Sequence, residues 1–272
     1  MNLPISKCLA FCCATAASLI LVGHASAELG QVIPMGDLER WAVLSLGSNS
    51  SNDRLSGSAL VQGDFGAAGA GSLTVKDNAT ISGNVYYGRG RSERIAGSGT
   101  MTGTRFRDQD FILNDAVNEA MAASEAAANF AATRNFSQIN LEQSQNLGLS
   151  GAPGETVVLS LRDFRMSGNS TLTLQGAPDT TFIINVTRQF SLSDNARIVL
   201  AGGVSWNDVL FNVRGKGSSV RLSGNAWLEG ILLANQRSVR LRDQAVIQGE
   251  LIADSVRIQG AGQINHPAVV SP

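Results

Sequence analysis

The stretch LSGNAWLEG, residues 222–230, and its counterpart LRDQAVIQG, residues 241–249, decide the fold. Both contain an apolar residue, a variable residue, Gly or Asp, a polar residue, a small residue, a variable residue and a second apolar residue. The pattern recurs at residues 55–63, 75–83, 166–174, 192–200 and, more weakly, 258–266. Irregular self-similarity of this kind is typical of a solenoid, in which each repeat stacks on the next. The sequence therefore predicts a mainly β fold, a single-domain β-helix (β-solenoid).

The polar positions of the repeat have a structural explanation. Gly and Asp tolerate the left-handed backbone of a sharp corner, and the small residue two positions later fits a space too tight for a larger side chain. We expect the asparagines of the repeat to be turn or ladder residues rather than calcium ligands, because no run supplies dense acidic oxygens. These asparagines are Asn78, Asn169, Asn195 and Asn225.

The first 27 residues have the features of a signal peptide. Lys7 gives a positive start, residues 9–22 are apolar, and Ala25 to Ala27 is an A-x-A cleavage site. All three cysteines lie in this segment. We therefore expect an exported protein, located outside the cell, at its surface or in the periplasm, with residues 28–272 as one domain. No membrane span is expected after cleavage.

Composition argues against several classes of function. The net charge of −1 gives no electrostatic case for nucleic acid as a partner. His266 is the only histidine beyond the signal segment, so no metal site and no cofactor is predicted. Carboxylates stand singly at turns, and only Asp163, with Arg162 and Arg165, forms a mixed cluster. We therefore predict no catalytic residues and no enzymatic activity.

Residues 108–134 form the one convincing helix of the sequence. Asp108 and Asp110 offer capping oxygens at its start. Its apolar stripe is expected to contain Phe111, Val117, Met121, Ser124, Ala128 and Ala131. Such a helix is long enough to lie along several coils. We expect residues 86–107 before it to be an exposed connection, and residues 137–154 after it to be a loop.

The C-terminal half resembles a known family. The pieces that carry the resemblance are FIINV at 182–186, LFNV at 210–213, EGILLA at 229–234 and GELIA at 249–253. In this order they resemble the ice-binding-like adhesive domains of bacterial surface proteins, including the choice-of-anchor A type. The resemblance implies a β-helix with coils often out of sequential order, one α-helix alongside, export, and a role in adhesion or ice binding. A weaker local resemblance is to bactofilins.

The candidate partner-binding face carries a column of arginines. Arg165, Arg221, Arg240 and Arg257 occupy the same slot of the repeat, interrupted by Ser191. Stacked like charges repel, so they require acidic neighbours, with Glu229, Asp243 and Glu250 as candidates, or an anionic partner. These residues favour a secreted, non-catalytic surface or matrix adhesion protein that binds a cell-surface or matrix polymer such as an anionic polysaccharide.

Two alternatives stay open. An ice-binding face requires a regular ladder of threonines, and the sequence offers Thr100, Thr102 and Thr104 in one place and Thr171 with Thr173 in another. The slots equivalent to Thr171 hold Arg197, Trp227, Val246 and Gln263, which argues against such a ladder. Self-association is the second alternative, because the ends of a solenoid expose unpaired strand edges.

Overall fold

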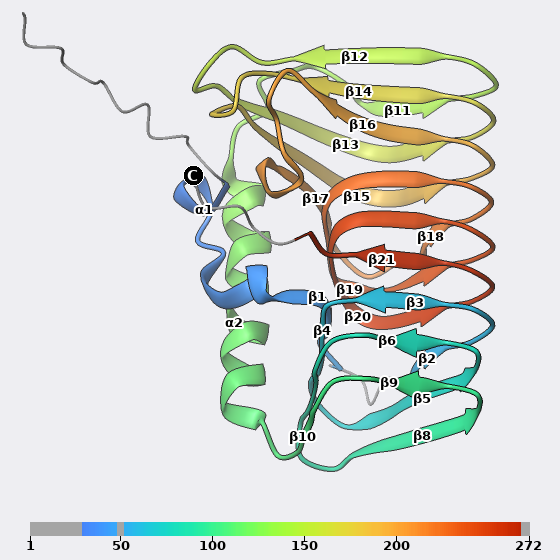
Figure 1. Cartoon of the computed structure of the whole chain (residues 1–272). Coiled ribbons are helices and arrows are strands. Elements are labelled where there is room, and N and C mark those ends of the chain that lie inside the picture. The colour runs from blue at the N-terminus through green and yellow to red at the C-terminus, as the bar shows by residue number, and fades with distance from the viewer. Residues whose placement is uncertain (1–28, 48–51, 268–272) are drawn as a thin grey trace, which may run out of the picture.

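The computed structural model describes residues 29–47 and 52–267, and this part of the chain forms a β-solenoid (Figure 1). Its 21 strands belong to one sheet and pair in parallel with the strands of neighbouring coils. The structure is therefore mainly β, as predicted. The predicted signal segment lies outside the described residues.

The coils present three flat faces. The helix face consists of β1 (Trp41–Ser45), β4 (Asp64–Ala67), β7 (Val85–Tyr87), β10 (Arg105–Phe106), β17 (Val209–Val213) and adjoining parts of β13 (Thr156–Met166), β15 (Thr181–Leu192), β19 (Trp227–Leu241) and β20 (Val246–Ile258). The arginine face consists of β2 (Asn52–Leu55), β5 (Gly71–Asp77), β8 (Arg91–Gly97), β11 (Gln138–Leu141), β18 (Val220–Leu222) and the last residues of β13, β15, β19 and β20. The threonine face consists of β3 (Leu60–Gln62), β6 (Thr80–Ile81), β9 (Thr100–Met101), β12 (Asn146–Ser150), β14 (Thr171–Gln175), β16 (Arg197–Ala201), β21 (Gln263–Asn265) and the first residues of β19 and β20.

The coils do not stack in sequence order. The stack begins at β11 and β12, follows the chain to β20 and β21, and then continues with the N-terminal coils β1–β3, β4–β6 and β7–β9 (Figure 1). At the junction, Arg257 of β20 pairs with Arg54 of β2, and Gln263 of β21 pairs with Leu60 of β3. The earliest and latest coils of the described chain are therefore neighbours in space, as the family resemblance implied.

One column of corner residues has a left-handed backbone from end to end. Its members, with φ between 58° and 77°, are Gln143, Gly168, Asp194, Gly224, Asp243, Gly260, Gly57, Asp77 and Gly97. Each Asp accepts a hydrogen bond from the backbone N–H of a Gly in the next coil, as Asp243 does from Gly224 at 3.1 Å. Asn169, Asn195 and Asn225 form a ladder of side-chain hydrogen bonds of 2.8 Å beside them. These contacts confirm the corner and ladder roles predicted for the repeat.

Two segments predicted as irregular are coils. Residues 86–107, expected to be an exposed connection, contain β8 and β9 with most of β7 and β10, and Gly97 takes the left-handed corner position. Residues 137–154, expected to be a loop, contain β11 and β12. Both segments lie at the ends of the stack, where β8, β9, β11 and β12 each have a paired strand on one side only. Their hydrophobic alternation is correspondingly weak.

The long helix α2 (Asp110–Asn129) runs along the helix face (Figure 1). It ends at Asn129 rather than near residue 134, because Phe130 is already extended. Asp108 and Asp110 do not cap it; the N-cap is Gln109, without a side-chain cap, and the Asp110 carboxylate accepts from the N–H of Arg89 instead. The predicted capping is therefore wrong.

The face of α2 that packs on the sheet is also different from the predicted stripe. Its buried residues are Leu113, Ala116, Ala120, Ala123, Ser124 and Ala127. Phe111 is 82% exposed and Met121 is 44% exposed. The alanines allow the helix to lie close to the sheet, so the larger side chains point away from it. Ser124, the one predicted member that is buried, exchanges hydrogen bonds with Asn212 of β17.

Two hydrophobic cores result from this arrangement. The first fills the solenoid with the inward residues of every coil. The second lies between the helix face, α2 and the lead-in segment α1 (Leu29–Val32) and η1 (Gly36–Arg40). The second core covers the helix face. In the described chain, only the arginine and threonine faces are left as flat sheet surfaces.

Candidate binding faces

The arginine column exists as one continuous row. The parallel register aligns Arg165 with Ser191, Ser191 with Arg221, Arg221 with Arg240, and Arg240 with Arg257. Neighbouring strands of a sheet lie about 4.8 Å apart, so these side chains project from the sheet close to one another. Burial, with the positive charges of Arg257, Arg242 and Arg221, lowers the pKa of Arg240.

The non-sequential stacking lengthens this row. Arg257 pairs with Arg54, Arg54 with Thr74, and Thr74 with Arg94. Arg54 and Arg94 belong to coils at the opposite end of the sequence, so sequence reasoning missed them. A signal was present, since Arg54 precedes Leu55 just as Arg221 precedes Leu222 and Arg257 precedes Ile258.

The acidic residues expected to neutralise the row are engaged elsewhere. Glu229 lies on the threonine face and accepts hydrogen bonds from Trp227 Nε1 and the N–H of Leu200. Asp243 accepts the corner hydrogen bond described above. Glu250 is fully buried. The prediction that these three carboxylates neutralise the column is therefore wrong, because the turns of each coil place them on another face, at a corner or in the interior.

Asp163 is the carboxylate nearest to one end of the row. Its oxygens accept from Arg188 Nε at 2.9 Å and Arg188 Nη2 at 2.7 Å, and Arg165 Nη2 lies 3.9 Å away. Arg188 lowers the pKa of Asp163, so the carboxylate is held in its charged form. The carboxylate of the mixed cluster noted in the sequence is thus buried and forms its short ion pair with Arg188, outside that cluster.

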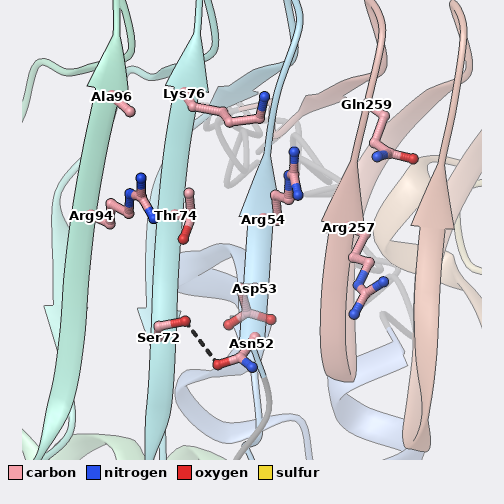
Figure 2. Close-up of a pocket in the computed structure, with 10 residues that line it drawn as sticks. All are labelled: Asn52, Asp53, Arg54, Ser72, Thr74, Lys76, Arg94, Ala96, Arg257 and Gln259. Atoms are coloured by element: carbon pink, nitrogen blue, oxygen red, sulfur yellow. Dashed lines mark hydrogen bonds between the residues drawn. The ribbon is translucent and has the colours of Figure 1, made fainter.

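A pocket of about 470 Å³ opens in the other end of the row. Figure 2 shows Arg94, Thr74, Arg54 and Arg257 side by side on β8, β5, β2 and β20. Thr74 is much shorter than the arginines that flank it, so it leaves a notch. Lys76 also lines the pocket and forms an ion pair of 3.0 Å with Asp77.

The threonine face has a different character. The residues of this face whose side chains point to solvent form two columns. Among the described residues of these columns, only Arg197 and Glu229 carry charge. The first column is Asn146, Thr171, Arg197, Trp227, Val246, Gln263, Leu60, Thr80 and Thr100. The register confirms the slots predicted for Arg197, Trp227, Val246 and Gln263. It also aligns Thr80 with Thr100, whose hydroxyls are 2.9 Å apart, so a short threonine ladder exists in the N-terminal coils.

Two pairs of titratable side chains are buried. Asp53 forms an ion pair with Arg91, and both side chains are fully buried. Glu250 Oε1 lies 3.3 Å from His266 Nε2, and burial raises the pKa of Glu250 and lowers that of His266. No group of three or more His, Cys, Asp or Glu residues that could hold a metal occurs in the described ranges. No helix within residues 29–47 and 52–267 is long and apolar enough to cross a membrane.

These features define a class of protein: a parallel β-solenoid with a helix along one face and two flat exposed faces. Residues 51–262 match the model of the ice-binding-like family. The chain therefore belongs to the ice-binding-like family. It is similar to an ice-binding protein of Leucosporidium sp. (strain AY30), 30% identical over 101 residues, a match that covers 37% of each chain.

Solved structures show the same fold. A glycosylated ice-binding protein from an Arctic yeast matches 91% of this chain and 97% of its own, with a TM-score of 0.58 and 20% identity. One from the Antarctic ascomycete Antarctomyces psychrotrophicus matches 86% and 98%, with a TM-score of 0.56 and 18% identity. A domain of Shewanella frigidimarina ice-binding protein matches 86% and 97%, with a TM-score of 0.53 and 19% identity.

Proposed function

We propose that this chain is an exported, non-enzymatic protein that binds ice through the threonine face. The observation that carries the proposal is a flat, nearly uncharged, exposed sheet in a chain of the ice-binding-like family. The relatives named above are ice-binding proteins. Adhesion, which the sequence alone favoured, has no comparable support from these relatives, so ice binding ranks first.

The choice of face follows from hydration. A surface that binds ice gives up part of its liquid hydration shell, and charged groups resist this most strongly. The arginine face carries a guanidinium on most of its coils, whereas the threonine face presents mainly hydroxyl, amide and aliphatic groups. The parallel pairing also arranges these groups in straight rows, in which successive groups are about 4.8 Å apart. A crystal surface requires such regular spacing.

The test is thermal hysteresis, the gap between the melting and freezing temperatures, together with inhibition of ice recrystallisation. The disruptive variant places two lysines at Val246 and Gln248, adjacent outward positions in the middle of the threonine face. The matched control places two lysines at Gln189 and Ser191, which have the same spacing on the arginine face.

We expect the purified protein to show hysteresis, the Val246→Lys/Gln248→Lys variant to lose most of it, and the Gln189→Lys/Ser191→Lys variant to keep it. Absence of activity in the unmodified chain would contradict ice binding. Loss in the control, with retention in the first variant, would move the ice-binding surface to the arginine face.

A further inference from the structure

We propose that the arginine face is a second binding site, for an acidic polysaccharide, and that the notch at Thr74 between Arg54 and Arg94 receives one anionic group of the polymer. This site lies on a different face from the proposed ice-binding surface and does not depend on it. It would give the chain the adhesive role that the sequence first suggested.

The arginines at the notch lack close ion-pair partners. Among the described residues, Arg54, Arg94 and Arg257 make no ion pair within 4.0 Å with a carboxylate. The carboxylates nearest to the pocket have other close partners, since Asp53 is buried against Arg91 and Asp77 pairs with Lys76. Arg54 attracts Asp77 only from beyond ion-pair distance. Like charges on neighbouring strands repel one another until a counter-charge arrives. An anionic ligand would supply that counter-charge.

The shape of the notch suits one anionic group. Arg54 and Arg94 lie one strand to either side of Thr74, so their guanidinium groups can approach one group from opposite sides (Figure 2). The planar guanidinium suits a carboxylate or a sulfate ester, because it donates two parallel hydrogen bonds. The Thr74 hydroxyl adds a donor at the floor. Carboxylates and sulfates are the anionic groups of acidic polysaccharides.

The length of the row suits a polymer. Arginines continue from the notch through Arg257, Arg240 and Arg221, so a polymer can contact several in succession. A second gap of the same form occurs at Ser191, between Arg221 and Arg165, although Asp163 lies beside it. Repeated weak contacts on one chain raise the overall affinity well above that of a single site.

The composition of the face favours a polysaccharide over single-stranded nucleic acid. Within the described residues, no outward slot of the arginine face holds an aromatic side chain. Bases bind such surfaces by stacking on aromatic rings. The anionic groups, rather than bases, are the part of the ligand that this surface can recognise.

The experiment measures the affinity of the full chain for heparin and for polygalacturonate by calorimetry at low and at moderate ionic strength. Neutral dextran and an oligothymidylate serve as comparison probes. The test variant is Arg54→Gln/Arg94→Gln. Its matched control, Arg89→Gln/Arg197→Gln, removes the same charge from exposed positions outside the row.

We expect salt-sensitive binding to at least one acidic polymer and none to dextran. Each arginine removed from the notch should weaken binding about tenfold, the effect of losing one hydrogen bond to a charged group. The control should change affinity by less than about threefold, because exposed charges far from the ligand are screened.

A third variant, Thr74→Glu, places a carboxylate in the notch. We expect it to lower the affinity for the polymer at least as much as the double substitution and to raise the melting temperature, because it neutralises Arg54 and Arg94 within the fold. Equal losses in the notch and control variants, or no binding at low ionic strength, would overturn the proposal. Tighter binding to the oligothymidylate would overturn the assignment to polysaccharide.

Discussion

The buried ion pair between Asp53 and Arg91 provides a test of how the N-terminal coils are attached to the stack. Both side chains are fully excluded from solvent. Asp53 Oδ1 also accepts from the N–H of Val256 at 2.7 Å, and Arg91 Nη1 donates to the carbonyl oxygen of Ala68 at 2.7 Å. One carboxylate therefore connects the first N-terminal coil, the third N-terminal coil and the last C-terminal coil.

We expect Asp53→Ala to lower the free energy of unfolding by about 3–5 kcal/mol, because it leaves the Arg91 charge buried without a partner. Replacing both residues has a different outcome. Burial raises the pKa of Asp53 to about 6 even beside Arg91, so desolvation outweighs attraction in this pair. The free energy of unfolding of the Asp53→Leu/Arg91→Met variant should therefore lie within about 1 kcal/mol of that of the unmodified chain.

Urea denaturation followed by circular dichroism measures these differences. The control is Arg105→Met, which removes an exposed partner of Glu93 at 3.6 Å and should cost less than about 1 kcal/mol. If Asp53→Ala lowered the free energy of unfolding no more than this control, the predicted penalty of an unpaired buried charge would be refuted. A double variant as unstable as the single one would show that the pair itself, rather than the unpaired charge, determines stability.

Three further predictions concern stability. Burial raises the pKa of Glu250 well above 4.5, so the folded state retains a proton that the unfolded state releases. Glu250 therefore makes the free energy of unfolding fall as the pH rises past 4.5, and Glu250→Gln should make that fall less steep in denaturation series at several pH values. Asp53, whose pKa burial raises to about 6, should account for part of the slope that remains. Gly224→Ala should cost at least about 1–2 kcal/mol, because φ is 69° and the added Cβ would lie 2.7 Å from the Asp194 carbonyl oxygen; Gly148→Ala, with nothing within 4 Å, should be nearly neutral in the same assay. Asn195→Ala should lower the melting temperature by the equivalent of about 1 kcal/mol through the loss of its ladder hydrogen bonds, and an unchanged value would show that the exposed ladder adds no stability.

The sequence was sufficient for the features that repeat within one coil. Corner residues such as Asp194 and Gly224 could be assigned because backbone strain restricts the choice of residue at the same point of every coil. The arginine slot of Arg221, Arg240 and Arg257 followed from the same alignment. These predictions required only the local pattern and not the order of the coils.

Features that depend on neighbours far away in the sequence could not be predicted. The local pattern places Arg54 in the arginine slot of its coil, but Arg54 joins the row only because that coil stacks on the coil of Arg257, which the local pattern does not specify. The predicted orientation of α2 was wrong for a related reason. Hydrophobicity placed Phe111 and Met121 inward, but the close approach of the helix to the sheet selects alanines such as Ala120 and Ala123.

The discontinuous stacking order has a consequence for how this molecule folds. The N-terminal coils are synthesised first, yet the partner strand of β2 on one side is β20, and the contact from Asp53 to Val256 spans 203 residues. Until β20 is available, the edge of β2 lacks its neighbour and can pair with other chains. Contacts this distant in sequence slow folding. We infer that the native stack is completed only after nearly the whole described chain has been synthesised.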